Sequence, residues 1–447
     1  MNKRILGLAL PNIITNITVP LLGMVDTAIV GHLSVAHLGG IAIGASIFNL
    51  IYWNFGFLRM GTSGFTAQAY GARRFDEAVR ILVRALAIAW TVALALILLQ
   101  WPIARLSEVI FSGSGEVMGY ALDYFFVRIW AAPATLGLYG LKGWCIGMQN
   151  SKLPMWIAIF LNVVNILSSL LFVLGFGWGI KGVALGTVLA QYSGLAIGLY
   201  FVFRYYGKLI RRHIDIRGSL RWSEMRGFFK VNGDIFLRTV CLSLVFTFVT
   251  AASGRISDQV LAIDTLLLQF FHLFSYFMDG FAYAGESLVG RYIGARDQRQ
   301  LRLSVRYLLL WGLIITVAFT GLYALFGRQF LSLFSNDPTV VEGAMDYLFW
   351  VLVIPVCGFA AFLFDGIFIG ATASRTMRDS MFVASACFFL VYYGGKWLLY
   401  GSPSAPPSQN ELWSNNILWL AFMVYISLRG ILQALRLKPE VYAQASR

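Results

Sequence analysis

The stretch Gly143-Trp-Cys-Ile-Gly-Met-Gln-Asn-Ser-Lys152 aligns with Gly366-Ile-Phe-Ile-Gly-Ala-Thr-Ala-Ser-Arg375, which lies 223 residues further along the chain. The same offset relates Gly71-Ala-Arg73 to Gly294-Ala-Arg296. Because this offset is almost half of the 447 residues, the chain consists of two homologous halves. The register is also kept by the pairs Gly31/Gly254, Arg105/Arg328, Phe111/Phe334, Asp123/Asp346 and Tyr124/Tyr347.

The composition is that of a membrane protein. Hydrophobic residues make up 58% of the chain and charged residues 13%, about half the charged fraction of a soluble domain. The mean hydropathy is +0.72. The apolar runs reach about 20 residues, the length with which an α-helix crosses a bilayer. The runs are continuous rather than alternating, so helices and not barrel strands are predicted.

The apolar runs predict twelve membrane spans, six in each half. Because six is even, both halves have the same orientation, and the repeats are parallel. An apolar chain duplicated in this way is typical of transporters. The spans are predicted at residues 8–30, 38–60, 82–104, 119–141, 154–176, 180–203, 232–254, 260–286, 303–326, 343–364, 380–400 and 415–435.

Lysine and arginine are distributed unevenly between the two sides. If the N-terminus is cytoplasmic, that side collects most of them, including the basic segment 204–230. By the positive-inside rule, both termini are cytoplasmic, and the chain is a multi-pass protein of the cell (inner or plasma) membrane. The opposite side keeps only Arg105, Lys181, Arg255, Arg328 and Lys396.

The longest charged connection separates the two halves. We expect an N-terminal lobe at 1–204 with spans 1–6, a basic cytoplasmic linker at 205–230 and a C-terminal lobe at 231–447 with spans 7–12. The net charge of +14 is explained by loops that face anionic lipid headgroups. No soluble segment of domain size accompanies the charge, so no nucleic-acid partner is expected. The mixed apolar and charged segments 71–80 and 294–302 predict short amphipathic helices on the cytoplasmic surface.

Asp26 is the most informative residue of the first half. It lies in span 1, where a charged carboxylate is costly, and its repeat counterpart is Val249. Pro11 and Pro20 give span 1 places to bend. A carboxylate there is a candidate for taking up and releasing a coupling proton or cation. The alternative is an inert aspartate that is hydrogen-bonded near a helix end.

Neutral polar residues follow at one-turn spacing in spans 5 and 6. Asn165 and Ser169 lie in span 5, and Thr187 lies in span 6. These groups are suited to solvate a buried carboxylate or a cation, and equally to bond across helices as structural links. Glycines four residues apart, such as Gly143 and Gly147, allow close helix packing, whether the helices are static or slide.

The second half carries its own buried acids. Asp279 and Glu286 are seven residues apart, on one face of span 8. Asp365 in span 10 corresponds by the repeat to Lys142 in span 4. This reversal of sign predicts either an ion pair between the lobes or two separate roles in coupling or substrate binding.

Motifs typical of enzymes are lacking. The chain has no GxxxxGK[ST], HExxH or GxSxG motif, and its cysteines and histidines do not cluster. We therefore expect no enzymatic activity, metal site or cofactor, and energy drawn from a gradient of H⁺ or Na⁺. We also expect a monomer.

Three stretches carry a family resemblance: residues 11–33 with Val25-Asp-Thr27, residues 59–72, and residues 363–372 with Phe368-Ile-Gly-Ala-Thr372. They resemble the multidrug and toxic compound extrusion (MATE) transporters, specifically the DinF branch. The resemblance implies twelve helices in a V of two lobes, and antiport of organic cations or other amphiphiles against H⁺ or Na⁺.

The resemblance also implies roles for individual residues. Asp26 matches the aspartate thought to bind the coupling cation, Asn165 and Thr187 match its polar partners, and Asp365 matches an acid of the second lobe. Ser169 departs from the pattern, because many members carry an aspartate there.

The sequence thus predicts a proton-coupled exporter of small, amphiphilic, mostly cationic drugs or toxins in the lipid bilayer. The alternatives are a Na⁺-coupled exporter, a flippase of lipid-linked precursors from the same wider superfamily, and a membrane scaffold or sensor.

Overall fold

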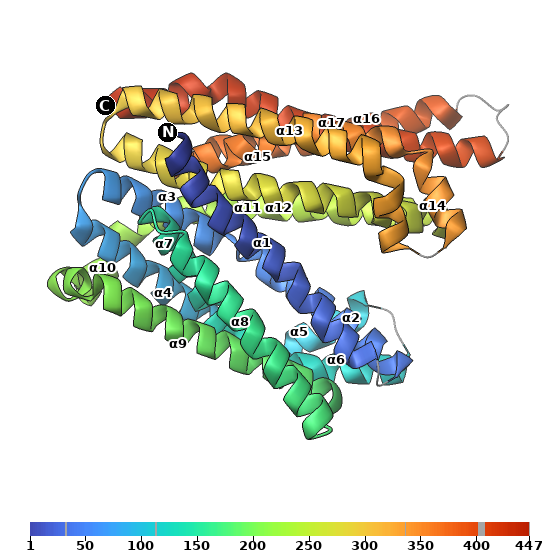
Figure 1. The fold of residues 1–447 in the computed structure, drawn as a ribbon, viewed down its shortest axis with the longest axis horizontal. Helices are drawn as coiled ribbons and strands as arrows, with labels where there is room; N and C mark the ends of the chain where they lie inside the picture. The colour runs from blue at the N-terminus through green and yellow to red at the C-terminus, as the bar shows by residue number, and fades with distance from the viewer. Residues whose placement is uncertain (32–33, 112–113, 336, 401–406, 447) are drawn as a thin grey trace. The chain divides into compact units, whose positions relative to one another are not determined.

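The computed structural model describes residues 1–31, 34–111, 114–335, 337–400 and 407–446, and these residues form helices without a β-strand (Figure 1). Two short 3₁₀ segments, η1 (Ile129–Ala131) and η3 (Tyr442–Ser446), and one π-helical turn, η2 (Leu171–Gly175), accompany the α-helices. The α-helices are α1 (Asn2–Gly31), α2 (Val35–Asn54), α3 (Phe57–Gly71), α4 (Phe75–Leu98), α5 (Gln100–Ile110), α6 (Gly115–Arg128), α7 (Ala132–Gly147), α8 (Lys152–Leu170), α9 (Gly179–His213), α10 (Ile216–Ser219), α11 (Trp222–Ile256), α12 (Asp258–Gly294), α13 (Gln298–Phe334), α14 (Pro338–Met345), α15 (Leu348–Gly370), α16 (Ser374–Tyr400) and α17 (Pro407–Glu440).

Within the described part of the chain, eleven helical stretches are long and apolar enough to cross a membrane. The remaining predicted span, at 119–141, is divided into α6, η1 and α7. Pro133 lies in the first turn of α7. It has no N–H for the carbonyl one turn earlier, in η1, so a regular α-helix is interrupted there. The twelve-helix repeat predicted from the sequence is confirmed.

The chain forms two compact units. The N-terminal unit comprises Gly7–Asn232, and the C-terminal unit comprises Gly233–Arg447 together with Met1–Leu6. The loop expected at 204–230 is largely helical, because α9 continues to His213 and α11 begins at Trp222.

An arginine of α4 anchors this basic segment to the N-terminal unit. Arg84 donates from Nε to the Ser219 carbonyl at 3.0 Å, and its Nη atoms pair with Glu77 and Glu224 at 2.7 and 3.0 Å. Charge-assisted hydrogen bonds from one buried guanidinium thus hold the two segments together.

The two halves share their tightest turns. Among the described residues, four that are not glycine have positive φ, and they form two pairs at the offset of 223: Arg73 (56°) with Arg296 (55°), and Gln149 (63°) with Thr372 (53°). The first pair lies between α3 and α4 and between α12 and α13. The repeat therefore extends to backbone conformation.

These turns correct one expectation from the sequence. The mixed apolar and charged segments near 71–80 and 294–302 suggested separate amphipathic helices on the cytoplasmic surface. Instead, α4 begins at Phe75 and α13 at Gln298. The left-handed residue reverses the chain so quickly that the charged segment becomes the first turn of the next long helix.

Glycines of the repeated stretch fix one helix crossing in each unit. A Cβ atom on Gly147 would lie 2.8 Å from the Ser63 carbonyl oxygen, and one on Gly370 would lie 2.6 Å from that of Glu286. Ser63 and Glu286 are themselves related by the repeat. Thus α7 crosses α3 as α15 crosses α12, at a distance that only glycine allows.

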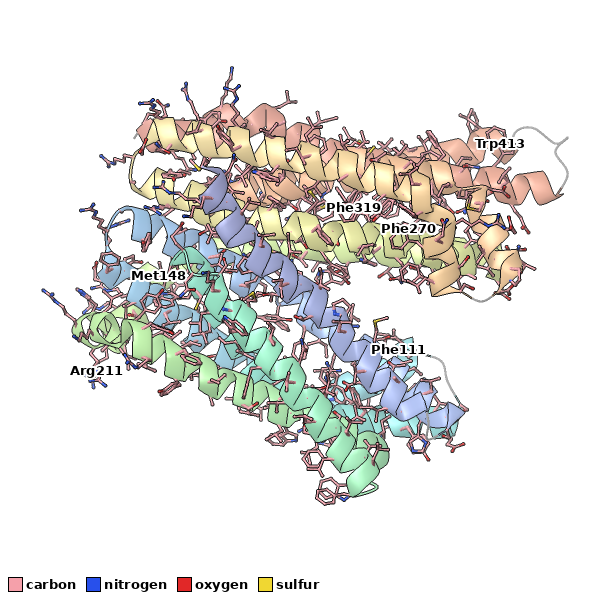
Figure 2. The ribbon with its side chains drawn as sticks, in the orientation of Figure 1. Phe111, Met148, Arg211, Phe270, Phe319 and Trp413 are labelled. Atoms are coloured by element: carbon pink, nitrogen blue, oxygen red, sulfur yellow. The ribbon has the colours of Figure 1, made fainter. Side chains whose placement is uncertain are left out.

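Aromatic side chains fill the core of the C-terminal unit. Phe270 of α12 and Phe319 of α13 lie between these two helices, as Figure 2 shows. Both contact Tyr323 edge-on, at centroid distances of 4.9 and 5.6 Å. The Tyr323 hydroxyl donates to the Phe270 carbonyl at 2.7 Å, so its polar atom is satisfied in the core.

Candidate functional site

Asp26 is buried in the N-terminal unit, with 5% of its surface exposed. It lies on α1, which also contains Pro11 and Pro20 inside the helix. Its carboxylate lies near the hydroxyls of Ser169 and Thr187 and is attracted electrostatically by the Arg128 guanidinium. Its Oδ1 atom has no hydrogen-bond partner among the described residues.

The polar residues predicted around Asp26 come together on α8 and α9. Asn165 donates from Nδ2 to Thr187 Oγ1 at 3.1 Å, and Thr187 donates to its own helix at the Val183 carbonyl. Asn165 Oδ1 and Ser169 Oγ are buried without a hydrogen-bond partner in the described structure. The site therefore offers one carboxylate and neutral oxygens, a set suited to a proton or a small cation.

Arg128 and aromatic residues around it were not predicted as part of this site. Arg128 ends α6 and donates to the Tyr124 hydroxyl. Its guanidinium also lies 4.8 Å from the centre of the Phe48 ring, a cation–π contact. Tyr52 is a further electrostatic neighbour. The sequence contained the signal, since a guanidinium within the predicted span 119–141 is rare without a role.

Asp365 forms the centre of a buried network in the C-terminal unit. Its Oδ2 accepts hydrogen bonds from Arg238 of α11 and from Arg429 of α17, the latter at 2.7 Å. Its Oδ1 accepts from Gln433 of α17 at 2.8 Å. Two guanidiniums of the same unit thus compensate its charge, so Asp365 does not need Lys142 of α7 as a counter-ion. The suggested pairing of Lys142 with Asp365 stays a prediction.

The two other acids predicted for the second half both lie on α12. Asp279 is half-buried and interacts electrostatically with Arg429, which connects it to the Asp365 network. Glu286 is fully buried, and its backbone carbonyl packs against Gly370 at the crossing with α15. Asp279 therefore lies near the Asp365 network, whereas Glu286 lies at the crossing of α12 with α15.

Asp264 is a buried acid that the sequence analysis did not single out. It lies on α12 with 1% of its surface exposed. Its Oδ1 accepts from Asn415 Nδ2 at 2.9 Å and Trp419 Nε1 at 2.7 Å, and its Oδ2 accepts from Ser253. These donors are all neutral. An aspartate inside the predicted span 260–286 was a readable signal.

One serine of each half ties two helices together at matching positions. Ser151 Oγ accepts from Asn12 Nδ2 at 2.9 Å in the N-terminal unit. Ser374, its repeat equivalent, donates to Asp234 Oδ2 at 2.8 Å in the C-terminal unit. Arg378 also binds Asp234, at 2.6 Å. Equivalent serines of the two halves thus form a neutral hydrogen bond in the N-terminal unit and a hydrogen bond to a carboxylate in the C-terminal unit.

Comparisons with known proteins agree with this duplicated architecture. The MatE family model matches residues 11–171 and again residues 235–395. The chain is 37% identical over 435 residues, 96% of its length and 90% of the relative's, to DNA damage-inducible protein F of Escherichia coli (strain K12). It is 25% identical over 361 residues, 76% of its length and 74% of the relative's, to the probable multidrug resistance protein NorM of Thermotoga maritima.

Solved structures show the same fold. A MATE protein crystallised in the bent conformation matches with a TM-score of 0.86 at 18% identity, covering 100% of this chain and 96% of that one. An outward-facing multidrug resistance MATE family transporter of the MOP superfamily matches at 0.83 and 19%, covering 100% and 97%. From the duplicated family match and the relative that extends over nearly the whole chain, the protein belongs to the MATE family of multidrug efflux transporters, with DinF among its relatives.

Proposed function

We propose that this protein is a proton-coupled antiporter that exports amphiphilic, mostly cationic drugs or toxins from the cytoplasm. Membership of the MATE family supports the export of small molecules. The observation that carries proton coupling is the buried Asp26, whose Oδ1 is unpartnered beside the hydroxyls of Ser169 and Thr187. A buried carboxylate with an unpartnered oxygen alternates between a charged and a neutral form as a proton binds and leaves.

The proposed cycle uses the charge of Asp26 and the prolines of α1. In the outward-open state, a proton from outside binds a carboxylate oxygen and converts the group from −1 to neutral. The loss of charge weakens the attraction for a cationic substrate, and α1 bends at Pro11 or Pro20. Release of the proton toward the cytoplasm restores the charge and the capacity to bind the next substrate.

The second unit supplies a further candidate site. We propose that Asp365, Asp279 and Glu286, with Lys142 of the other half, take part in coupling or substrate binding. Support comes from the contact of Asp365 with Arg429 and from the electrostatic interaction of Asp279 with the same guanidinium. A change of charge at Asp365 or Asp279 is therefore felt by the other through Arg429.

We further propose that the protein acts as a monomer in the cell membrane with both termini in the cytoplasm. Both termini lie at the same end of the C-terminal unit (Figure 1). Arg4 donates to the Tyr292 hydroxyl near the end of α12 at 2.9 Å. The positive-inside rule assigns this arginine-rich end to the cytoplasm.

Two alternatives are favoured by specific observations. The buried neutral oxygens Asn165 Oδ1 and Ser169 Oγ favour coupling to Na⁺, which binds oxygen ligands. The buried arginines Arg238 and Arg429 favour a flippase of lipid-linked precursors, because guanidiniums recognise phosphate.

Efflux of a fluorescent cation from proteoliposomes tests the proposal when ΔpH and a Na⁺ gradient are imposed separately. We expect efflux driven by ΔpH and its loss in Asp26→Asn. The matched control is Asp123→Asn, which removes an exposed carboxylate paired with Lys181 and should export normally. ΔpH-driven export by Asp26→Asn would disprove the mechanism. Efflux driven only by Na⁺ would favour the Na⁺-coupled exporter, and flipping of a lipid-linked phosphate without cation efflux would favour the flippase.

A further inference from the structure

Two cavities of the C-terminal unit are lined in part by residues of the first half of α13. The first has a volume of about 590 Å³ and lies between the beginning of α13, the end of α17 and η3. The second has a volume of about 680 Å³ and lies between α13 and α15. Both volumes fall in the range of small-ligand sites, roughly 300–1,000 Å³.

The first cavity is basic. Arg302 and Lys438 line it, and the Arg302 guanidinium lies 5.7 Å from the centre of the Tyr442 ring. Gln298 and Ser446 add polar groups that can donate hydrogen bonds. No acidic residue is among its lining residues in the described structure. Two cations without a carboxylate in the lining match a ligand group with negative charge, such as a phosphodiester.

The second cavity is apolar except at one edge. Leu303, Leu310 and Leu313 of α13 face Phe359 and Phe364 of α15 across it. Leu310 and Leu313 are about half exposed, in a helix that is apolar enough to cross the bilayer. Such a groove matches a hydrocarbon chain rather than a polar solute.

Arg306 connects the two cavities. It lines the apolar cavity and lies one helical turn after Arg302 on α13. Residues four apart on a helix are neighbours on its surface, about 5–6 Å between Cβ atoms. The basic group of the first cavity is thus adjacent to the groove, at the depth where the predicted span 303–326 meets the headgroup region.

We propose that this composite site binds an anionic phospholipid of the leaflet on the side of the termini. The phosphate lies between Arg302 and Lys438, and one acyl chain lies in the groove between α13 and α15. A soluble phosphate compound would use only the basic cavity and would leave the half-exposed leucines unexplained. The lipid joins α13, α15 and the chain end around η3, so its binding stabilises the folded C-terminal unit. The site is independent of the coupling ion and of the transported substrate.

Native mass spectrometry of the full-length protein, titrated with phosphatidylglycerol or phosphatidylcholine, tests the site. We expect Arg302→Gln/Lys438→Gln to weaken phosphatidylglycerol binding by about thirtyfold. Each basic residue near an anionic lipid contributes about 1 kcal/mol, and the loss of two such contributions corresponds to this change in affinity. Phosphatidylcholine binding should not change. The matched control is Arg211→Gln/Arg212→Gln at the end of α9, where both arginines are exposed; Figure 2 labels Arg211.

A second variant separates lipid from soluble anion. Leu310→Trp fills the groove and should weaken phosphatidylglycerol binding while leaving the basic cavity intact. Glycerol 3-phosphate should compete poorly with the lipid for the wild-type protein. Full competition by glycerol 3-phosphate, wild-type lipid affinity in the Arg302/Lys438 variant, or an equal loss in the Arg211/Arg212 control would overturn the proposal. Melting temperatures in phosphatidylcholine identify any variant that fails to fold.

Discussion

Asn165 on α8 donates a hydrogen bond of 3.1 Å to the hydroxyl of Thr187 on α9, among the polar groups that surround Asp26. Thr187 in turn donates to the Val183 carbonyl. The threonine hydroxyl thus accepts a hydrogen bond from α8 and donates one within α9. It thereby fixes the orientation of the Asn165 amide beside Asp26.

Replacing Thr187 by valine keeps its shape and removes the acceptor for Asn165. A buried donor left without a partner costs about 1–3 kcal/mol. We expect a lower melting temperature in detergent and weaker ΔpH-driven efflux. The matched control is Thr265→Val, because the Thr265 hydroxyl is exposed and bonds only within its own helix. A Thr187→Val protein with unchanged melting and efflux would contradict this role.

Asp365→Asn should destabilise the C-terminal unit strongly. The substitution leaves Arg238 and Arg429 buried without their carboxylate. Removing one partner of a buried ion pair costs about 3–5 kcal/mol. The measurement is thermal unfolding, compared with Glu342→Gln, which breaks an exposed pair with Arg328 and should cost less than about 1 kcal/mol. Similar losses in both variants would show that the network does not depend on charge compensation.

Gly370→Ala should be destabilising and Gly394→Ala harmless or stabilising. A Cβ atom on Gly370 would lie 2.6 Å from the Glu286 carbonyl oxygen, which is backbone and cannot turn away. Around Gly394 in α16, nothing lies within 4 Å of such an atom. Alanine there gains about 0.4–1 kcal/mol from the reduced entropy of the unfolded chain. Equal melting temperatures of the two variants would disprove the close crossing of α12 and α15.

Acid should loosen the start of α14. Asp337 caps this helix, and its Oδ1 accepts from Thr339 N at 2.9 Å and Thr339 Oγ1 at 2.7 Å. These hydrogen bonds hold the pKa of Asp337 below its ordinary value. Because the pKa is lower in the folded state, the stabilisation is fully present above the unfolded pKa of about 4 and is lost as the pH falls through the folded pKa.

Hydrogen exchange of α14 at several pH values measures this loss. Asp337→Asn keeps an acceptor at the helix cap, so its α14 protection should stay nearly constant over the same pH range. Equal pH dependence in the two proteins would exclude Asp337 as the cause.

The helices and the duplication could be predicted from the sequence because they follow from local quantities. Apolar runs of about 20 residues define spans without knowledge of neighbours. The repeat also located the close crossings, since glycines four residues apart recur in both halves. The separate amphipathic helices were wrong because a three-residue turn, Ala72–Arg74, leads directly into α4, and no side-chain pattern announces a left-handed arginine.

The polar networks were predictable only in part. Asn165 and Thr187 stood out as polar residues in two consecutive predicted spans, and the structure brings them into hydrogen-bond contact. Arg429 and Gln433 did not, because their relation to Asp365 depends on how α17 packs against α15, at sequence separations of 64 and 68 from Asp365. Such pairings are set by tertiary packing, which periodicity within one helix does not encode.

Arg73, Arg296, Gln149 and Thr372 hold a conformation that costs an L-residue about 1–2 kcal/mol. In each pair the two φ angles are similar, although glutamine and threonine share little chemistry. The duplication therefore preserved the backbone conformation of these turns, while the side chains at the second pair diverged. A turn exchanged between the halves would therefore keep a left-handed residue at the same place, and glycine at each of the four positions would relieve the backbone strain.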